Sequence, residues 1–344
     1  MKIGIGLPNN VVGVPGPLMV AWAQRAEQRG FESLTTIDRL VYPSFDSIIA
    51  LALAAGATTD LALVTNILLA PLYPPAILAK QLASLALAAG NRIAIGVAVG
   101  AREDDYTAAG VDFDKRGRLL DDQVTVMREA WRGTPVADST PLSPEPVTIP
   151  LLFGGRSKAT LRRATTVGDG WVGGALREYA WQSEFADRVR AGWREAGRPG
   201  NPQTHASVNF AIGEQHIAES GREHLAHYYG FKPEYAELNV DDLITSPQDA
   251  LDTVRAYADL GFDRLLFHPA VPASTRSTDW PTRCCSGRPP YPLTGRTQVI
   301  DVKGTSGPRQ ARRGAAATEA STAYSGTHFG PGSRSQIAAR ERID

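Results

Sequence analysis

The chain has 344 residues, of which 43% are hydrophobic, and its 36 Lys and Arg residues balance 36 Asp and Glu residues. This length is enough for one large domain or for two smaller ones. The zero net charge gives no support for nucleic-acid binding, and no apolar run approaches the length of a membrane-spanning helix. The adjacent Cys284 and Cys285, the only cysteines in the sequence, cannot build a disulfide framework or a zinc cluster, so we expect no metal.

The composition changes abruptly at about residue 276. Residues 276–344 are rich in Ser, Thr, Gly and Pro and carry 11 Lys and Arg against 5 Asp and Glu, which leaves a net charge of −6 for residues 1–275. We interpret residues 1–275 as the folded domain and residues 276–344 as a disordered, basic, low-complexity tail. A shifted reading frame would explain the change, and a basic arm for an acidic partner is the alternative. The N-terminus is too short and too strand-like for a signal peptide, so we expect a cytoplasmic protein.

Apolar runs alternate with amphipathic segments along the whole domain. The predicted strands are Ile3–Leu7, Phe31–Ile37, Leu61–Ala70, Arg92–Val99, Ile149–Phe153, Trp171–Val172, His205–Ile212 and Asp263–Phe267. A helix is predicted after each strand but the last, and residues 216–245 form an irregular helical stretch that suggests a lid or inserted helices. Eight such units predict a closed (β/α)₈ TIM barrel. The alternative is a doubly wound open sheet, against which the lack of a G-x-G-x-x-G motif after the first strand argues.

The most informative local pattern lies directly after the fifth predicted strand. Gly154 and Gly155 allow a tight turn and a close approach of a ligand to the backbone, and Ser157 can cap the helix that follows. The free N–H groups of that helix start attract an anion, and Arg156 and Lys158 add positive charge. The turn therefore predicts a phosphate site, although an ordinary strand-to-helix turn with a good cap would show the same residues.

Several motifs together resemble the bacterial luciferase-like monooxygenase family. They span the segments Thr65–Pro75, Leu78–Leu85, Gly90–Tyr106, Arg116–Asp121 and Phe153–Trp171, and the resemblance covers about residues 1–270. It implies a TIM barrel that binds reduced FMN or the deazaflavin coenzyme F-420. It also implies a cis peptide bond between Asn66 and Ile67, in a bulge of the third strand behind the flavin ring.

The resemblance also assigns cofactor-binding positions. The phosphate would lie on the turn formed by Gly154, Gly155, Arg156 and Ser157, and the end of the fourth strand, Val99 and Gly100, would lie near the cofactor. Asn66 and Ile67 complete this set.

Two positions depart from the deazaflavin-dependent dehydrogenases of the family. Asp38 is followed by Arg39 where those enzymes commonly have His, and Ala101 stands where the sugar-phosphate type has an acid. These departures favour FMN.

Three side chains are candidates for catalysis. Asp38 could orient a proton donor or pair with Arg39, and Arg39 could bind an anionic substrate or remain a solvated cation at the rim. Glu103 could act as general acid or base if burial raised its pKa, or form an ion pair with Arg102 or Arg116. His268, placed after the last predicted strand, is a further acid–base candidate whose alternative is a capped loop histidine.

These features together predict a flavin-dependent oxidoreductase, most simply a monooxygenase that uses reduced FMN and O₂ on a small organic substrate. A separate flavin reductase would supply the reduced cofactor, because no nicotinamide motif is present, and a homodimer is expected from the resemblance. The alternatives are a coenzyme F-420-dependent hydride-transfer enzyme of the same fold and a non-catalytic flavin-binding barrel.

Overall fold

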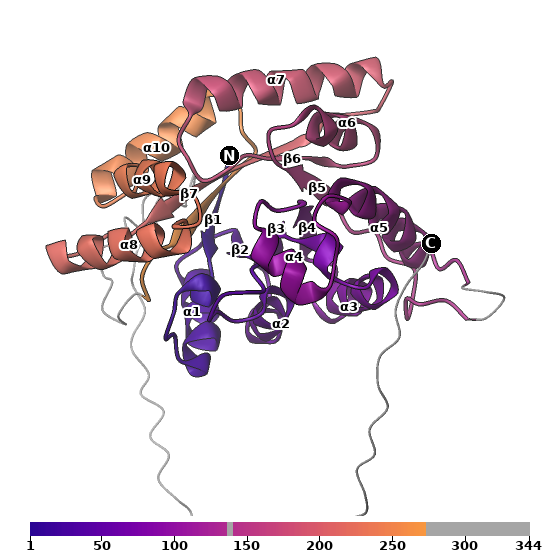
Figure 1. Cartoon of the computed structure of the whole chain (residues 1–344), viewed down its shortest axis with the longest axis horizontal. Coiled ribbons are helices and arrows are strands. Elements are labelled where there is room, and N and C mark those ends of the chain that lie inside the picture. Colours follow the sequence, from indigo (N-terminus) through magenta and orange to yellow (C-terminus); the bar gives the residue numbers. More distant parts are fainter. Residues whose placement is uncertain (136–139, 273–344) are drawn as a thin grey trace, which may run out of the picture. The chain divides into compact units, whose positions relative to one another are not determined.

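The computed structural model describes residues 1–135 and 140–272, and these residues form a closed barrel of eight parallel strands (Figure 1). Each strand pairs with its neighbours in chain order, and β8 pairs with β1 to close the barrel. The predicted TIM barrel is therefore confirmed. The strands are β1 (Lys2–Gly6), β2 (Ser33–Thr36), β3 (Ala62–Leu68), β4 (Ile93–Val97), β5 (Leu151–Gly154), β6 (Gly170–Val172), β7 (Gln203–Phe210) and β8 (Arg264–Pro269).

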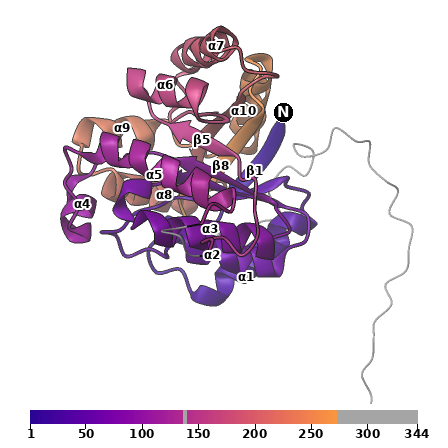
Figure 2. The same cartoon turned by 90° about the vertical axis from the view of Figure 1, so that its right-hand side faces the viewer.

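Helices surround the strands on all sides (Figures 1 and 2). One long helix follows each of the first seven strands, and its apolar face packs on the barrel. These helices are α1 (Gly16–Gln28), α2 (Ser47–Ala57), α3 (Pro75–Ala88), α5 (Arg116–Trp131), α6 (Lys158–Thr166), α7 (Tyr179–Glu195) and α10 (Pro247–Asp259). Side chains cap several of the starts: Ser246, for example, accepts a hydrogen bond from the Asp249 N–H at 3.1 Å, ahead of Pro247.

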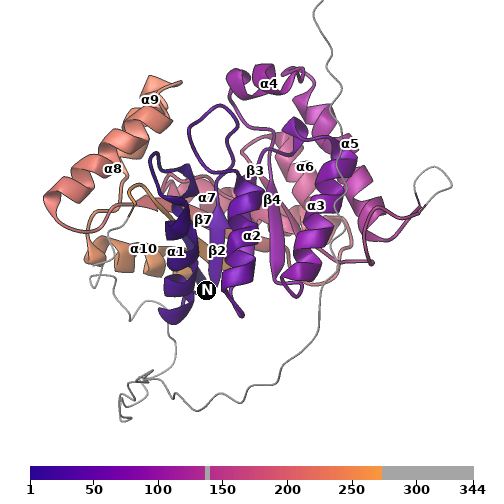
Figure 3. The same cartoon turned by 90° about the horizontal axis from the view of Figure 1, so that it is seen from below.

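The remaining helices are inserted in the loops that follow the C-terminal ends of the strands. They are the short helices η1 (Pro8–Asn10) and η2 (Ala70–Leu72), α4 (Glu103–Ala109), α8 (Gln215–Tyr228) and α9 (Pro233–Asp241). Figure 3 shows α4, α8 and α9 at the end of the barrel opposite the N-terminus. We call this end, with its loops, the mouth.

One apolar core runs between the strands and the outer helices. Trp171 of β6 is fully buried and contacts the rings of Trp181 and Phe185 of α7, and Trp131 of α5 is nearly as buried. The Trp131 indole N–H donates to the Ala79 carbonyl at 3.1 Å and so ties α5 to α3. Burying each such side chain contributes about 1.5–3 kcal/mol, which holds the helices in register with the strands that carry the site.

The structure corrects several element predictions. Four of the eight strands are shorter than predicted by one to three residues, and the irregular stretch 216–245 consists of the two regular helices α8 and α9. Helix α4 was missed because it has only 7 residues, although Gly110 in the left-handed region ends it in a recognisable way. His268 lies within β8 and is buried, so the prediction of a loop histidine is wrong. The predicted tail, residues 276–344, lies outside the described residues.

Candidate active site

The third strand carries the irregularity that the resemblance implied. The Asn66–Ile67 peptide bond is cis, and the pairing of β3 with β4 shifts register between Thr65 and Leu68. The bulge turns the Ile67 side chain toward β5, where a Cβ atom on Gly154 would lie only 2.1 Å from Ile67 Cδ1. Gly154 is therefore required for the bulge as much as for the turn that it begins.

The turn after β5, residues 154–158, is open to solvent, and hydrogen bonds to neighbouring residues fix its backbone. Gly155 has φ +118°, and a Cβ there would lie 2.9 Å from Thr160 Oγ1. The Trp171 indole N–H donates to the Gly155 carbonyl at 2.9 Å, and the Ser157 hydroxyl accepts from the Thr160 N–H at 3.1 Å, as predicted for a cap. The N–H groups of the first helical turn have no intrahelical partner, so they can face an anion.

Arg156 is not a free cation in this turn. Its guanidinium forms an ion pair with Glu178, with Nη1 at 2.7 Å from Oε2, and lies over the Trp181 ring at 3.9 Å. Both side chains of the pair remain about half exposed, at 50% and 41%, so the pair is weak and an incoming phosphate can compete with Glu178 for Arg156.

The Arg116–Asp121 motif has a structural role behind the same turn. The Asp121 carboxylate accepts from Arg163 Nε at 2.7 Å and from Arg162 Nη2 at 2.9 Å, which fixes α6 on α5. Partial burial opposes ionisation of Asp121, but the two guanidiniums hold its pKa below the ordinary value. This contact sets the direction of α6 and hence the position of the turn at its start.

Asp38 is buried at the end of β2 and holds the loop after β3. Its Oδ2 accepts from the Leu69 N–H at 3.0 Å, and the Tyr73 hydroxyl lies 3.1 Å from both carboxylate oxygens. Burial raises the pKa of Asp38 to about 6, although these two hydrogen bonds lower it. Burial also raises the pKa of Tyr73, so Tyr73 stays protonated and Asp38 can hold a proton near neutral pH.

Arg39 is tied to α4. Its Nη2 lies 2.7 Å from Asp104 Oδ2, its Nε lies 3.0 Å from Asp105 Oδ2, and its side chain is only 7% exposed. Asp105 also accepts from the N–H groups of Leu40 and Val41, so this group holds the β2 loop against α4. A substrate anion would have to displace both carboxylates from Arg39. In this structure Arg39 therefore serves to join the loop after β2 to α4. Its role in catalysis remains a prediction.

Glu103 differs from its predicted setting. It begins α4, its side chain is exposed, and it pairs with neither Arg102 nor Arg116 among the described residues. The burial on which an acid–base role depended is absent.

Val99 and Gly100 were expected at the end of the fourth strand, but β4 ends at Val97 and both residues lie on the loop directly after it. The Tyr106 hydroxyl of α4 donates to the Val99 carbonyl, and Gly100 has φ +70° beside Leu69. The loop is therefore fixed by α4 on one side and by the loop after β3 on the other. Its contact with a cofactor stays a prediction.

The mouth contains a polar pair that the sequence did not reveal. Asn66 Nδ2 lies 2.9 Å from His268 Nε2 across the barrel, and both residues are buried. Burial lowers the pKa of His268 to about 4, so the imidazole is neutral near pH 7. Its Nδ1 is enclosed and has no hydrogen-bond partner in the described part of the chain. Asn66 lies on β3 and His268 on β8, 202 positions apart and on strands that do not pair, so only closure of the barrel brings them together.

Within residues 1–135 and 140–272, no three His, Cys, Asp or Glu side chains are grouped in a way that could hold a metal ion. No helix of the same residues is long and apolar enough to cross a membrane.

Comparison with known proteins places these features in a family context. Residues 13–243 match the family model described as luciferase-like monooxygenase. An uncharacterized protein of Mycobacterium tuberculosis is 34% identical over 185 residues, which cover 44% of this chain and 63% of that protein. The F-420-dependent hydroxymycolic acid dehydrogenase of the same organism is 28% identical over 218 residues, which cover 56% of this chain and 58% of that protein. The chain thus spans less than two thirds of the length of these curated relatives.

Solved structures share the fold at low sequence identity. An F-420-dependent secondary alcohol dehydrogenase in complex with an F-420–acetone adduct superposes with a TM-score of 0.68 at 18% identity, covering 83% of this chain and 99% of that chain. Monooxygenase RslO1 from Streptomyces bottropensis gives a TM-score of 0.66 at 18% identity, covering 83% and 96%. At this identity the two structures support the barrel and nothing finer.

Proposed function

The chain belongs to the luciferase-like monooxygenase family, whose members are oxidoreductases, and from that membership we propose an F-420-dependent enzyme that transfers a hydride to or from a small organic substrate. The observation that carries coenzyme binding is the contact between the bulge of β3 and the turn after β5. Ile67 packs where Gly154 has no side chain. The bulge that would face the coenzyme ring and the turn that would hold its phosphate are therefore in direct contact.

The residues present fit a ring coenzyme that bears a phosphate. At the turn, a side chain at Gly155 would collide with Thr160, and the N–H groups at the start of α6 are available to an anion. Lys158 and a displaceable Arg156 add charge. Asn66, Ile67, Val99 and Gly100 would face the ring, while Gly154, Gly155, Arg156 and Ser157 would hold the phosphate. When bound, the deazaflavin ring supplies or accepts the hydride.

The chain itself contributes position and proton handling. Trp171 fixes the carbonyl of Gly155, so the N–H groups of the turn keep one direction. Asp38 holds the loop after β3 through the Leu69 N–H and, with a pKa of about 6, can retain or release a proton at its carboxylate beside Tyr73. Because Arg39 and Glu103 lack the burial or freedom that a proton shuttle needs, Asp38 is the stronger of the three predicted catalytic residues.

The choice of F-420 over FMN comes from the relatives. The hydroxymycolic acid dehydrogenase, at 28% identity, and the F-420-dependent glucose-6-phosphate dehydrogenase of Kribbella flavida, at 26% over 202 residues, are both named for F-420. The coenzyme first predicted from the sequence, FMN, is not confirmed by any of these comparisons.

A second candidate is the monooxygenase that uses reduced FMN and O₂. One observation favours it: Arg39 occupies the place of the common His and is locked by Asp104 and Asp105, so the histidine of the dehydrogenases has no direct substitute there. This reading requires a separate flavin reductase as partner.

The test is binding of F-420 and of FMN, each oxidised and reduced, to the full chain, followed by fluorescence. We expect F-420 to bind more tightly than FMN. A Gly155→Ala variant should lose at least tenfold in affinity, because the new Cβ meets Thr160 and the positive φ disfavours it. The matched control is Gly174→Ala, where no atom lies within 4 Å of the new Cβ. Tight binding of reduced FMN alone would move the assignment to the monooxygenase, and binding of neither by folded protein would refute both.

A further inference from the structure

Four arginines of the described residues stack on aromatic rings in the loops after β2, β4 and β5. They are Arg39, Arg102, Arg116 and Arg156. Two of them, Arg39 and Arg156, are neutralised by carboxylates, as described above. The other two, Arg102 and Arg116, both follow β4 and differ in having no carboxylate partner within the described part of the chain.

Arg102 lies between α4 and the turn that joins α8 to α9. Its guanidinium carbon is 4.5 Å from the Tyr228 ring centre and 4.2 Å from the Phe231 ring centre, and its Nη2 donates to the Tyr228 carbonyl at 2.6 Å. A guanidinium has five N–H donors in its plane, and stacking occupies its faces rather than its edges. Apart from the hydrogen bond to the Tyr228 carbonyl, the N–H donors of Arg102 have no partner within the described residues.

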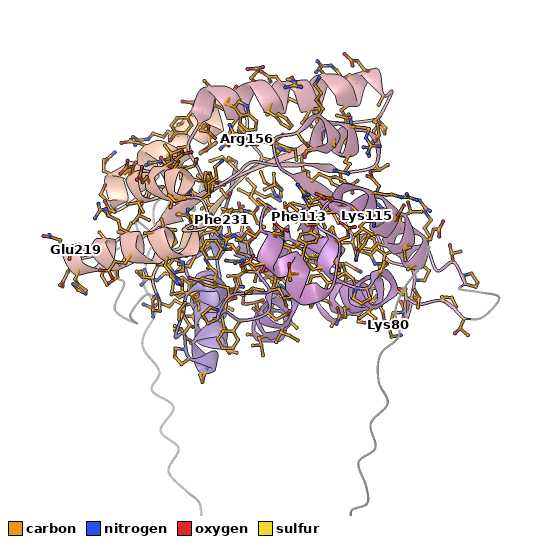
Figure 4. All side chains as sticks on the ribbon, in the orientation of Figure 1. Lys80, Phe113, Lys115, Arg156, Glu219 and Phe231 are labelled. Carbon is orange, nitrogen blue, oxygen red and sulfur yellow. The ribbon has the colours of Figure 1, made fainter. Side chains whose placement is uncertain are left out.

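Arg116 repeats this arrangement at the start of α5. Its guanidinium carbon lies 3.7 Å from the Phe113 ring centre, and Nη1 donates to the Phe113 carbonyl at 2.6 Å. Its Nε is enclosed and has no partner among residues 1–135 and 140–272. Figure 4 labels Phe113 and Phe231, the two rings under these guanidiniums, and both lie toward the centre of the view.

Both arginines adjoin the loop that is expected to lie near the coenzyme. Arg102 comes two residues after Gly100. Arg116 is linked to Val99 through two rings: it stacks on Phe113, Phe113 stands edge-on to Tyr106 with ring centres 5.2 Å apart, and the Tyr106 hydroxyl donates to the Val99 carbonyl. Arg102 along the chain and Arg116 through two aromatic rings are thus both connected to the loop after β4, and ring contacts fix the orientation of each guanidinium.

We propose that Arg102 and Arg116 bind an anionic group, a carboxylate or a phosphate, on a ligand held in the mouth. A half-buried guanidinium such as those of Arg102 and Arg116 costs free energy when it has no counter-charge, and a bidentate carboxylate or phosphate is the partner that its planar donors fit. The anion belongs either to the coenzyme side chain or to the substrate. Only the assignment to the coenzyme rests on the proposed function.

The carboxylate that follows Arg102 in the sequence does not satisfy this need. Glu103 follows Arg102 in sequence, yet its side chain is exposed and forms no ion pair with either arginine. Asp104 and Asp105 are already paired with Arg39. The stacking rings also fix both guanidiniums in advance, so little side-chain entropy remains to be lost when an anion binds.

The experiment compares the wild type with Arg102→Met, Arg116→Met and the control Arg118→Met. Arg118 lies on the same helix as Arg116, but its side chain is 86% exposed and its ion pair with Asp122 spans 3.8 Å. Two probes are used with each full-length protein: dissociation constants for F-420 and for its deazaflavin riboside, which lacks the phosphate and carboxylates, and the rise in melting temperature caused by citrate at constant ionic strength. Arg102→Gln retains a donor for the Tyr228 carbonyl and serves if Arg102→Met does not fold.

If the coenzyme carries the anion, both variants raise the dissociation constant for F-420 at least fivefold and leave that for the riboside unchanged. If the substrate carries it, F-420 binding is unchanged, but citrate no longer stabilises the variants in the presence of saturating F-420. The wild type could bind neither F-420 nor FMN and yet be stabilised by citrate, with that stabilisation lost in Arg102→Met and in Arg116→Met. This result would overturn the proposed function and retain the anion site. If Arg102→Met and Arg116→Met respond to both probes as the wild type and Arg118→Met do, the anion site itself is overturned.

Discussion

Replacing Asp38 with Asn tests whether a buried charge at the mouth destabilises the fold. The pKa of Asp38 is about 6 in the folded protein against an ordinary value of 3.8. Because the folded state binds the proton more tightly, stability contributed at this site falls as pH rises from about 4 to about 6 and is constant above that. The difference corresponds to about 3 kcal/mol at pH 7.5, at about 1.36 kcal/mol for each pH unit.

Asn keeps an acceptor for the Leu69 N–H and can donate to the Tyr73 oxygen, but its second amide hydrogen is left without a partner at a cost of about 1–2 kcal/mol. Asp38→Asn should therefore be more stable than the wild type by about 1–2 kcal/mol at pH 7.5 and less stable by a similar amount below pH 4. Since a domain of this size changes its melting temperature by about 2 °C per kcal/mol, the gap between the two curves should change by about 6 °C across that range.

The assay is the melting temperature of both proteins from pH 3.5 to pH 8, in steps of half a pH unit. The other titrating groups are common to both proteins, so they cancel in the difference. The exposed Asp259→Asn serves as control and should track the wild type at every pH. Parallel curves for Asp38→Asn and the wild type would show that Asp38 is not held as a destabilised carboxylate, and the argument for its proton-holding role would fail with it.

Three further changes each test a single feature of the structure. Gly154→Ala puts a Cβ 2.1 Å from an isoleucine carbon of the bulge and should cost about 1–3 kcal/mol in stability, measured by melting, whereas Gly174→Ala should cost under 1 kcal/mol. Trp171→Phe removes the N–H that fixes the Gly155 carbonyl. It should weaken F-420 binding about three- to tenfold and leave binding of the phosphate-free riboside unchanged. Equal losses of affinity for both ligands would contradict a role of Trp171 in the turn. Ile49 and Leu53 lie one turn apart on α2, and their side chains are 58% and 39% exposed. If they form the contact of the expected homodimer, changing both to Glu should halve the mass measured by light scattering. An unchanged dimer would exclude this face of α2 as the contact.

The alternation of apolar runs and helical segments was sufficient to predict the barrel. Strand and helix periodicity is a local property, and eight parallel units have few ways to bury both faces of their strands. For the same reason the turn at Gly154, Gly155 and Ser157 was recognisable, since a glycine turn and the Ser157 cap are local features; the contacts of this turn with Ile67 and Trp171 were not. The position of the cis bond between Asn66 and Ile67 came from the resemblance, because no local propensity indicates it.

The charged candidates at the mouth could not be judged from sequence. Arg39 was considered as a free anion-binding group, but Asp104 and Asp105, more than 60 positions away in the chain, neutralise it. Glu103 was assigned an environment that burial would have had to create, and its place on the outer side of a short helix leaves it exposed. Whether a charge is paired or solvated depends on which loops meet, and loops from different units meet only when the barrel closes.

The sequence by itself determined the eight-unit barrel, the mouth at which the site must lie and the turn after β5, because these follow from hydrophobic period, glycine and capping. Only the tertiary structure decided which polar groups act together. The pKa of Asp38, the Asn66–His268 pair and the unpaired donors of Arg102 and Arg116 each depend on burial and on partners supplied by distant segments. Electrostatic energies in a protein vary with distance and with exclusion of water, and both are set by packing that no single stretch of sequence contains.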